Sequence, residues 1–111
     1  MSRKVNVTMA LLVLTLALAI GWCSYTVIRY EHAFDATSNG DDVSSVITAF
    51  GKPNVRESSG ALYPRYASQP CGSPCTERLW WENPFLSGIE ARSVELDNRH
   101  RVIDKEHWVS P

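Results

Sequence analysis

The pattern of hydrophobic and polar positions divides the chain into two unlike parts. No residue between Lys4 and Arg29 is charged, and the run from Ala10 to Ile20 consists almost entirely of Leu, Ala, Val and Ile. As a helix rising about 1.5 Å per residue, the 24 uncharged residues 5–28 would cover roughly 36 Å, enough to cross a bilayer. Beyond this segment the apolar residues occur in short groups separated by polar residues, which is typical of a small globular domain.

Aromatic side chains gather at the C-terminal end of the apolar segment. Trp22, Tyr25 and Tyr30 lie there, and such amphipathic rings favour the headgroup region of a membrane. Arg3 and Lys4 precede the segment, and basic residues prefer the cytoplasmic side. The pattern therefore predicts a cytoplasmic N-terminus and a membrane interface at the three aromatic residues.

Three interpretations of the apolar segment are open. It is an uncleaved anchor, a signal peptide cleaved at the small-x-small pattern of residues 17–19, or a lipoprotein signal modified at Cys23. Apolar residues continue to Ile28 where a cleaved signal would turn polar, and the bulky Trp22 precedes Cys23. Both observations favour the uncleaved anchor, and with it a bacterial inner-membrane location and a periplasmic C-terminal domain.

The anchor interpretation gives the chain four parts. We expect a cytoplasmic tip at 1–4, a transmembrane signal anchor at 5–28, a polar tether at 29–40 and a periplasmic domain at 41–111. Residues 38–40 are Ser-Asn-Gly, a sequence that breaks whatever helix emerges from the membrane.

A short amphipathic helix is predicted at the start of the domain. Val43, Val46, Ile47 and Phe50 follow the i, i+3, i+4, i+7 spacing of one apolar helix face. Ser38 or Asn39 would be the N-cap, with Asp41 and Asp42 in the first turn, where negative charge complements the helix dipole. Gly51 supplies a C-terminal stop.

The rest of the domain is cut by four prolines into short segments that are typical of β-strands. The last two segments should form a hairpin, because Asn98 and His100 between them tolerate the left-handed backbone of a tight connection. The strands are predicted at 61–67 (an edge strand, given its proline), 76–82, 90–97 and 101–109.

These elements predict an α+β fold, with one or two helices packed on a three- to four-stranded antiparallel sheet. The predicted core consists of the large apolar residues of the helix and the strands: Val43, Val46, Ile47, Phe50, Leu79, Trp81, Val94, Leu96, Val102 and Trp108.

Cys71 and Cys75 are separated by Gly-Ser-Pro, which favours a tight loop, and outside the cytoplasm such a pair oxidises to a disulfide. A thiol redox centre is a second interpretation, although thioredoxin-type centres have two intervening residues instead of three. A zinc site is a third, with His100 and His107 as the available imidazoles but without a recognised ligand spacing. The disulfide is favoured, and it should shape a loop more than it holds the fold.

Two consecutive tryptophans give the candidate binding surface. Trp80 and Trp81 lie in one predicted strand, so their side chains point to opposite faces of the sheet. If Trp81 packs under the helix, Trp80 faces the other side, where Tyr63, Tyr66 and Phe85 would join it in an apolar patch. Aromatic residues are enriched at interface centres, so this patch is predicted to bind a partner. The alternative is that the proline-rich loop before the strand folds back and covers Trp80.

Part of the chain resembles a known family. Residues 40–53 (GDDVSSVITAFGKP) resemble the helix-to-strand signature of the SmpA/OmlA family, the small subunit of the machine that assembles outer-membrane β-barrels. Residues 80–82 (WWE) look like the aromatic motif of that family's second strand, and residues 94–97 with 101–102 look like its final hairpin. The resemblance covers residues 40–109. It implies two helices against a three-stranded antiparallel sheet, as in β-lactamase-inhibitor-like domains, and a protein-binding role in a bacterial envelope.

Charge and motifs narrow the function further. The formal net charge of −1 gives no basic surface for nucleic acid. No nucleophile–base pair, paired carboxylates or phosphate loop stands out, so we expect no enzyme activity, no cofactor, no metal and no small-molecule substrate. The remaining titratable residues near the C-terminus are explained by alternating charges on the solvent face of a hairpin: Asp97, His100, Asp104, Glu106 and His107.

The expected function is that of an accessory or assembly factor. The chain would be a single-pass inner-membrane protein of a Gram-negative bacterium that contacts membrane lipid through Val5–Ile28 and binds another envelope or membrane protein through its periplasmic domain. As an alternative, it is a small integral subunit of a multi-subunit membrane complex, held mainly through the transmembrane helix. A third hypothesis, a thiol-active or metal-binding envelope protein, requires Cys71 and Cys75 to be reactive.

Overall fold

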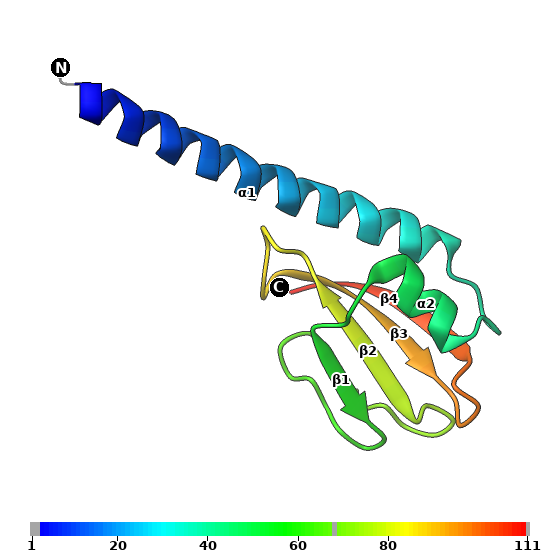
Figure 1. The fold of residues 1–111 in the computed structure, drawn as a ribbon. Coiled ribbons are helices and arrows are strands. Elements are labelled where there is room, and N and C mark those ends of the chain that lie inside the picture. Colours follow the sequence, from blue (N-terminus) through cyan, green and yellow to red (C-terminus); the bar gives the residue numbers. More distant parts are fainter. Residues whose placement is uncertain (1–2, 68, 111) are drawn as a thin grey trace.

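The structure is a computed structural model that describes residues 3–67 and 69–110; the first two residues of the expected cytoplasmic tip and the last residue of the expected domain lie outside it. The strands form one antiparallel sheet in the order β1-β2-β3-β4 (Figure 1), which confirms the predicted α+β class. The elements, in chain order, are α1 (Arg3–Ala36), α2 (Val43–Phe50), β1 (Val55–Ser58), β2 (Glu77–Glu82), β3 (Glu90–Leu96) and β4 (Val102–Val109).

Helix α1 is long and apolar enough to cross a membrane or to act as a signal sequence. Residues 3–22 are exposed on every side, and this part of the helix projects away from the sheet (Figure 1). The C-terminal turns differ, because Tyr30 and Ala33 are buried against the domain and Phe34 packs beside them. The expected tether at 29–40 is therefore helical as far as Ala36, and its apolar i, i+3, i+4 positions make it part of the domain.

Tyr30 is packed in the domain core and is not exposed on the helix surface as Trp22 and Tyr25 are. Only 9% of Tyr30 is exposed, and its ring centre lies 6.0 Å from that of Phe50 on α2. Sequence spacing grouped the three aromatic residues, but burial against Phe50 assigns Tyr30 to the core. Trp22 and Tyr25 are exposed, and their interface role stays a prediction.

We expect Tyr30→Ser to lower the free energy of unfolding of the full chain by about 2–4 kcal/mol, because it removes a buried ring from the core. Urea unfolding in detergent, followed by circular dichroism, would measure the change. Tyr25→Ser is the matched control, since Tyr25 is exposed one turn earlier on the same helix. Equal stability of the two variants would show that α1 is not part of the domain core.

Helix α2 ends at Gly51 as the sequence predicts, but it begins later than predicted, because Asp42 is the N-cap and not a residue of the first turn. The Asp42 side chain caps the N-terminus by accepting a hydrogen bond from the Ser44 backbone N–H at 3.1 Å. Gly51 ends the helix with a φ of 94°, and its N–H donates to the Ile47 carbonyl at 2.7 Å. Helix α2 is tied to α1 by Arg29, whose Nε donates to the Ala49 carbonyl at 2.9 Å.

Three of the predicted strands are present, as β2, β3 and β4, but the predicted edge strand at 61–67 is wrong. That segment forms a turn, in which the Ala67 N–H donates to the Tyr63 carbonyl at 3.0 Å. The edge strand is instead β1, which pairs antiparallel with β2. Segment 61–67 packs its aromatic rings on the face of the sheet, which prevents it from extending the edge.

The β3–β4 connection confirms the predicted hairpin. His100 adopts a φ of 60°, the left-handed conformation that its side chain type tolerates. The backbone N–H groups of Arg101 and Arg99 donate to the Asp97 carboxylate at 3.1 and 2.8 Å, and these hydrogen bonds hold the pKa of Asp97 below its usual value. Beyond the turn, the register shifts between Glu95 and Leu96, a β-bulge that reverses the facing of the rest of β4.

Apolar side chains pack on both faces of the sheet. On one face, Trp81 stacks on Phe50 of α2, with ring centres 4.1 Å apart. Nine of the ten predicted core residues lie in or against this cluster, but Trp108 does not. The bulge turns Trp108 to the opposite face, where it packs against Trp80.

Candidate interaction surface

The predicted patch around Trp80 is covered. Trp80 does lie on the sheet face away from the helices, but its side chain is fully buried. The Tyr63 and Tyr66 rings lie over it, with centres 5.3 and 5.5 Å from that of Trp80. Of the two alternatives, the loop that folds back is therefore correct, and Trp80 is not an exposed docking residue. Phe85 is exposed in the β2–β3 loop and does not belong to this cluster.

Polar contacts hold the covering loop in place. The Tyr63 hydroxyl donates to Glu82 Oε1 at 2.5 Å, and Arg65 pairs with the same oxygen at 3.1 Å. The Tyr66 hydroxyl accepts a hydrogen bond from the Gly88 N–H at 2.7 Å. The loop is thus held over Trp80 by contacts with β2 and with the β2–β3 loop, both of which come much later in the sequence.

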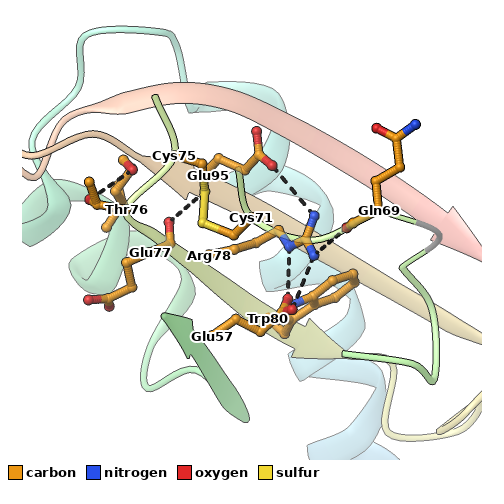
Figure 2. Close-up of a disulfide and its surroundings, with 10 residues drawn as sticks. Glu57, Gln69, Cys71, Cys75, Thr76, Glu77, Arg78, Trp80 and Glu95 are labelled. Atoms are coloured by element: carbon orange, nitrogen blue, oxygen red, sulfur yellow. Dashed lines mark hydrogen bonds and ion pairs between the residues drawn. A yellow bond between two sulfur atoms is a disulfide. The ribbon is translucent and has the colours of Figure 1, made fainter. Parts of the chain in front are cut away.

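A buried ion pair lies beside Trp80 (Figure 2). Arg78 and Glu57 face each other across β2 and β1, and Arg78 Nε and Nη2 donate to the two Glu57 oxygens at 2.8 and 3.1 Å. Trp80 Nε1 donates to the same carboxylate. Arg78 also donates to the Gln69 carbonyl at 3.0 Å and lies 3.5 Å from Glu95. The guanidinium therefore joins two strands, a loop and the tryptophan into one rigid unit.

Cys71 and Cys75 form the predicted disulfide, and both residues are buried (Figure 2). The loop that they close is held to the turn after β1, because the Cys71 N–H donates to the Ala61 carbonyl at 3.2 Å and the Gly60 N–H donates to the Cys71 carbonyl at 2.9 Å. The disulfide thus positions the loop segment that carries Gln69. Within residues 3–67 and 69–110, no three His, Cys, Asp or Glu side chains are grouped so as to hold a metal ion.

A hollow of about 450 Å³ opens next to the buried Arg78–Glu57 ion pair. Three carboxylates line it, those of Glu95, Asp104 and Glu106, whereas the charge of the one cation in its wall, Arg78, is already matched by Glu57. The bulge in β4 matters here, because it turns Asp104 and Glu106 toward the same face as Glu95. The full lining is Gln69, Pro70, Arg78, Glu95, Asp104, Glu106 and Trp108.

The carboxylates act on one another in the hollow. Burial raises the pKa of Glu95, Arg78 lowers it, and the negative charges of Asp104, Glu106 and Glu57 raise it again. The pKa of Glu95 therefore lies above its usual value of 4.5, which means that the hollow disfavours a further negative charge.

This shift gives stability a pH dependence. Because the folded pKa of Glu95 is raised, the unfolded chain loses the proton first as pH rises, and stability falls from the usual carboxyl pKa upward. We expect Glu95→Gln to unfold at a higher temperature than the wild type at pH 7, with the difference shrinking as pH falls from the raised pKa of Glu95 toward 4.5 and absent well below 4.5. Thermal unfolding across this range checks it, with Glu31→Gln on the exposed face of α1 as control. A difference independent of pH would contradict the assignment.

The other titratable residues of the hairpin are dispersed. Asp97 and His100 belong to the β3–β4 turn. His107 lies near Glu90, with its Nε2 atom 3.6 Å from a Glu90 carboxylate oxygen, and it does not line the hollow. Only Asp104 and Glu106 line the hollow, so the structure does not gather the five into one site.

Comparison of the chain with protein-family models, curated proteins and solved structures finds no significant match. The SmpA/OmlA resemblance of residues 40–109 stays a prediction. What the structure shows is coarser: a long N-terminal apolar helix and a four-stranded antiparallel sheet, one strand more than the resemblance implies.

Proposed function

We propose that the chain is a single-pass inner-membrane protein whose periplasmic domain binds another envelope protein as an accessory or assembly factor. The exposed apolar surface of α1 supports the anchor, since residues 3–22 are exposed and the helix is long and apolar enough to cross a membrane. The disulfide supports an oxidising compartment, because such bonds persist in the periplasm and are rare in the cytosol.

The observation that carries the binding function is the acidic hollow. Its three carboxylates stand on a wall fixed by the Arg78–Glu57 pair, so the negative charge is held in a defined geometry. Trp108 adds an aromatic ring to the lining. Carboxylates beside a ring suit a cationic group, and a hollow of about 450 Å³ admits long side chains. The partner therefore presents a segment with exposed Lys or Arg, guided by charge complementarity.

Photocrosslinking in intact cells tests this proposal. A photoreactive residue in place of Glu106, at the hollow, is compared with one in place of Ser45, exposed on α2 at the other face. We expect one envelope protein to be crosslinked at Glu106 only, and the adduct to disappear in the Asp104→Lys variant. Identical adducts at both positions, or none at Glu106, would refute the hollow as the binding surface.

A second candidate function, a small integral subunit held through its helix, is favoured by the rigid continuity of α1 from the apolar span into the domain core. Replacing residues 5–22 by an unrelated transmembrane sequence separates the two, because it keeps Tyr30 and Ala33 in place. Retention of the partner favours the docking domain, and loss favours the subunit.

A further inference from the structure

Exposed apolar side chains cluster at one end of the domain. Phe85, Leu86 and Ile89 belong to the β2–β3 loop and are 53%, 40% and 49% exposed. Val109, at the end of β4, is 65% exposed and pairs with Glu90, the residue after Ile89. The Ser110 N–H donates to the Ile89 carbonyl at 2.6 Å, which ties the end of β4 to the loop. We call these four side chains the apolar tip.

The loop is shaped so that it presents these side chains. Asn83 is buried, and its side-chain oxygen accepts hydrogen bonds from the backbone N–H groups of Phe85 and Leu86 at 2.9 and 3.3 Å. The Ile89 N–H donates to the Leu86 carbonyl at 2.9 Å, and Gly88 turns the chain with a φ of 84°. These polar contacts hold the backbone of the loop in place while its apolar side chains stay exposed.

The tip lies at the end of the domain that faces the N-terminal part of α1. The chain just after α1 lies level with the start of β4, where the Gly40 N–H donates to the Val102 carbonyl at 2.7 Å. Nearer the N-terminus of α1, the Phe34 carbonyl accepts a hydrogen bond from Lys105 Nζ at 2.6 Å. Val102 pairs with Leu96, and Lys105 pairs with Val94. Going along α1 toward its N-terminus therefore also means going along β3 toward the β2–β3 loop.

The next turn of α1 continues this direction. Arg29 contacts the C-terminal end of α2, where the Gly51 carbonyl accepts a hydrogen bond from Trp81 Nε1 at 3.1 Å. Trp81 is the last buried residue of β2, and the loop that carries the apolar tip follows it on the side of the N-terminal part of α1 (Figure 1). Because α1 has no break between residues 3 and 36, the direction from the apolar span to the domain is fixed.

We propose that the apolar tip inserts into the interfacial region of the same bilayer that α1 crosses. This inference rests on the membrane anchor of the proposed function. The bilayer is the occupant that the geometry favours, since the tip is exposed and lies at the end of the domain on the side of the exposed apolar span of α1 (Figure 1). The charged residues beside the tip are paired, which lowers the cost of insertion: Arg65 lies 3.1 Å from Glu82, and Glu90 lies 3.4 Å from Arg92. A domain held at two points would keep the acidic hollow at a constant height above the membrane.

Depth-dependent fluorescence quenching tests the proposal on the full chain. The starting variant is Cys23→Ser, which leaves the Cys71–Cys75 disulfide intact, and Phe85→Cys is then labelled with an environment-sensitive fluorophore without reductant. The labelled chain is reconstituted in phosphatidylethanolamine–phosphatidylglycerol vesicles with iodide loaded on both sides. Asn98→Cys, exposed at the opposite end of the hairpin, and Leu14→Cys, in the apolar span, are labelled as controls.

We expect iodide to quench the Phe85→Cys label several-fold less than the Asn98→Cys label, and headgroup nitroxide lipid to quench it more. Leu86→Asp in the Phe85→Cys background should restore iodide quenching. Equal quenching at positions 85 and 98, with position 14 protected, would overturn the tip and leave the anchor standing, whereas iodide access at position 14 would overturn the anchor itself. Protection from iodide without quenching by nitroxide lipid would mean that protein covers the tip, which also overturns the proposal.

Discussion

Trp81→Ala should lower the free energy of unfolding by about 3–5 kcal/mol, the usual cost of truncating a buried tryptophan. The Trp81 side chain is fully buried between α2 and the sheet and stacks on Phe50 at 4.1 Å. It also satisfies the Gly51 carbonyl at the end of α2 through its Nε1 atom at 3.1 Å. The substitution therefore opens a cavity and removes the hydrogen bond that fixes the end of the helix. Because small domains are stable by only about 5–15 kcal/mol, much of the margin is lost.

Urea unfolding of the full chain in detergent would measure this loss. Trp22→Ala removes the same side chain from an exposed position on α1 and should leave the midpoint unchanged. Trp81→Phe keeps the stacking and loses only the hydrogen bond, so we expect it to fall between the two. If Trp81→Ala and Trp22→Ala had the same midpoint, the stacked core between α2 and β2 would be refuted.

The core under α2 was predictable because its signals are local. The apolar positions of α2 repeat with the helical period, and Gly51 marks its end within the same short stretch. Two consecutive tryptophans in a strand must likewise face opposite ways, which placed Trp80 and Trp81 correctly.

The errors have non-local causes. The four residues of β1 are too few to show a period, so the edge strand was predicted in the proline-containing segment 61–67 instead. Tyr30 was assigned to a membrane interface because its contact with Phe50 joins residues 20 positions apart. The bulge between Glu95 and Leu96 has no glycine or other marker in the sequence, and it moved Trp108 out of the predicted core.

The candidate surface was predictable only in outline. The Trp80 side chain was correctly placed on the sheet face opposite Trp81, but whether Trp80 was open or covered depended on contacts such as that of Tyr63 with Glu82. The hollow itself arises from the bulge and from the pairing of Arg78 with Glu57, which are 21 residues apart. No spacing rule connects such residues before the sheet is formed.

Arg78→Ala should cost about 3–5 kcal/mol of folding stability, because it leaves the Glu57 carboxylate buried without its countercharge. Glu57 is 4% exposed, and Trp80 Nε1 would be its only remaining side-chain donor among the contacts of the described residues. Arg78→Lys should recover only part of the loss, since an ammonium group does not reproduce the two-point contact with Glu57.

The double variant Arg78→Met with Glu57→Leu distinguishes a buried charge penalty from simple loss of packing. Replacing both partners by apolar side chains of similar size removes the uncompensated charge, so the double variant should be more stable than Arg78→Ala despite carrying two changes. Urea midpoints of the single and double variants check this order, and a double variant that is the least stable of the set would contradict it. In both the single and the double variant, Glu95 at the hollow loses Arg78, its cationic neighbour. The double variant also removes the Glu57 carboxylate, which acts on Glu95 in the opposite sense to Arg78, so the three carboxylates of the hollow remain with little change in net charge beside them. If the Arg78–Glu57 pair fixes the wall of the hollow, as proposed, crosslinking at Glu106 should weaken in this variant.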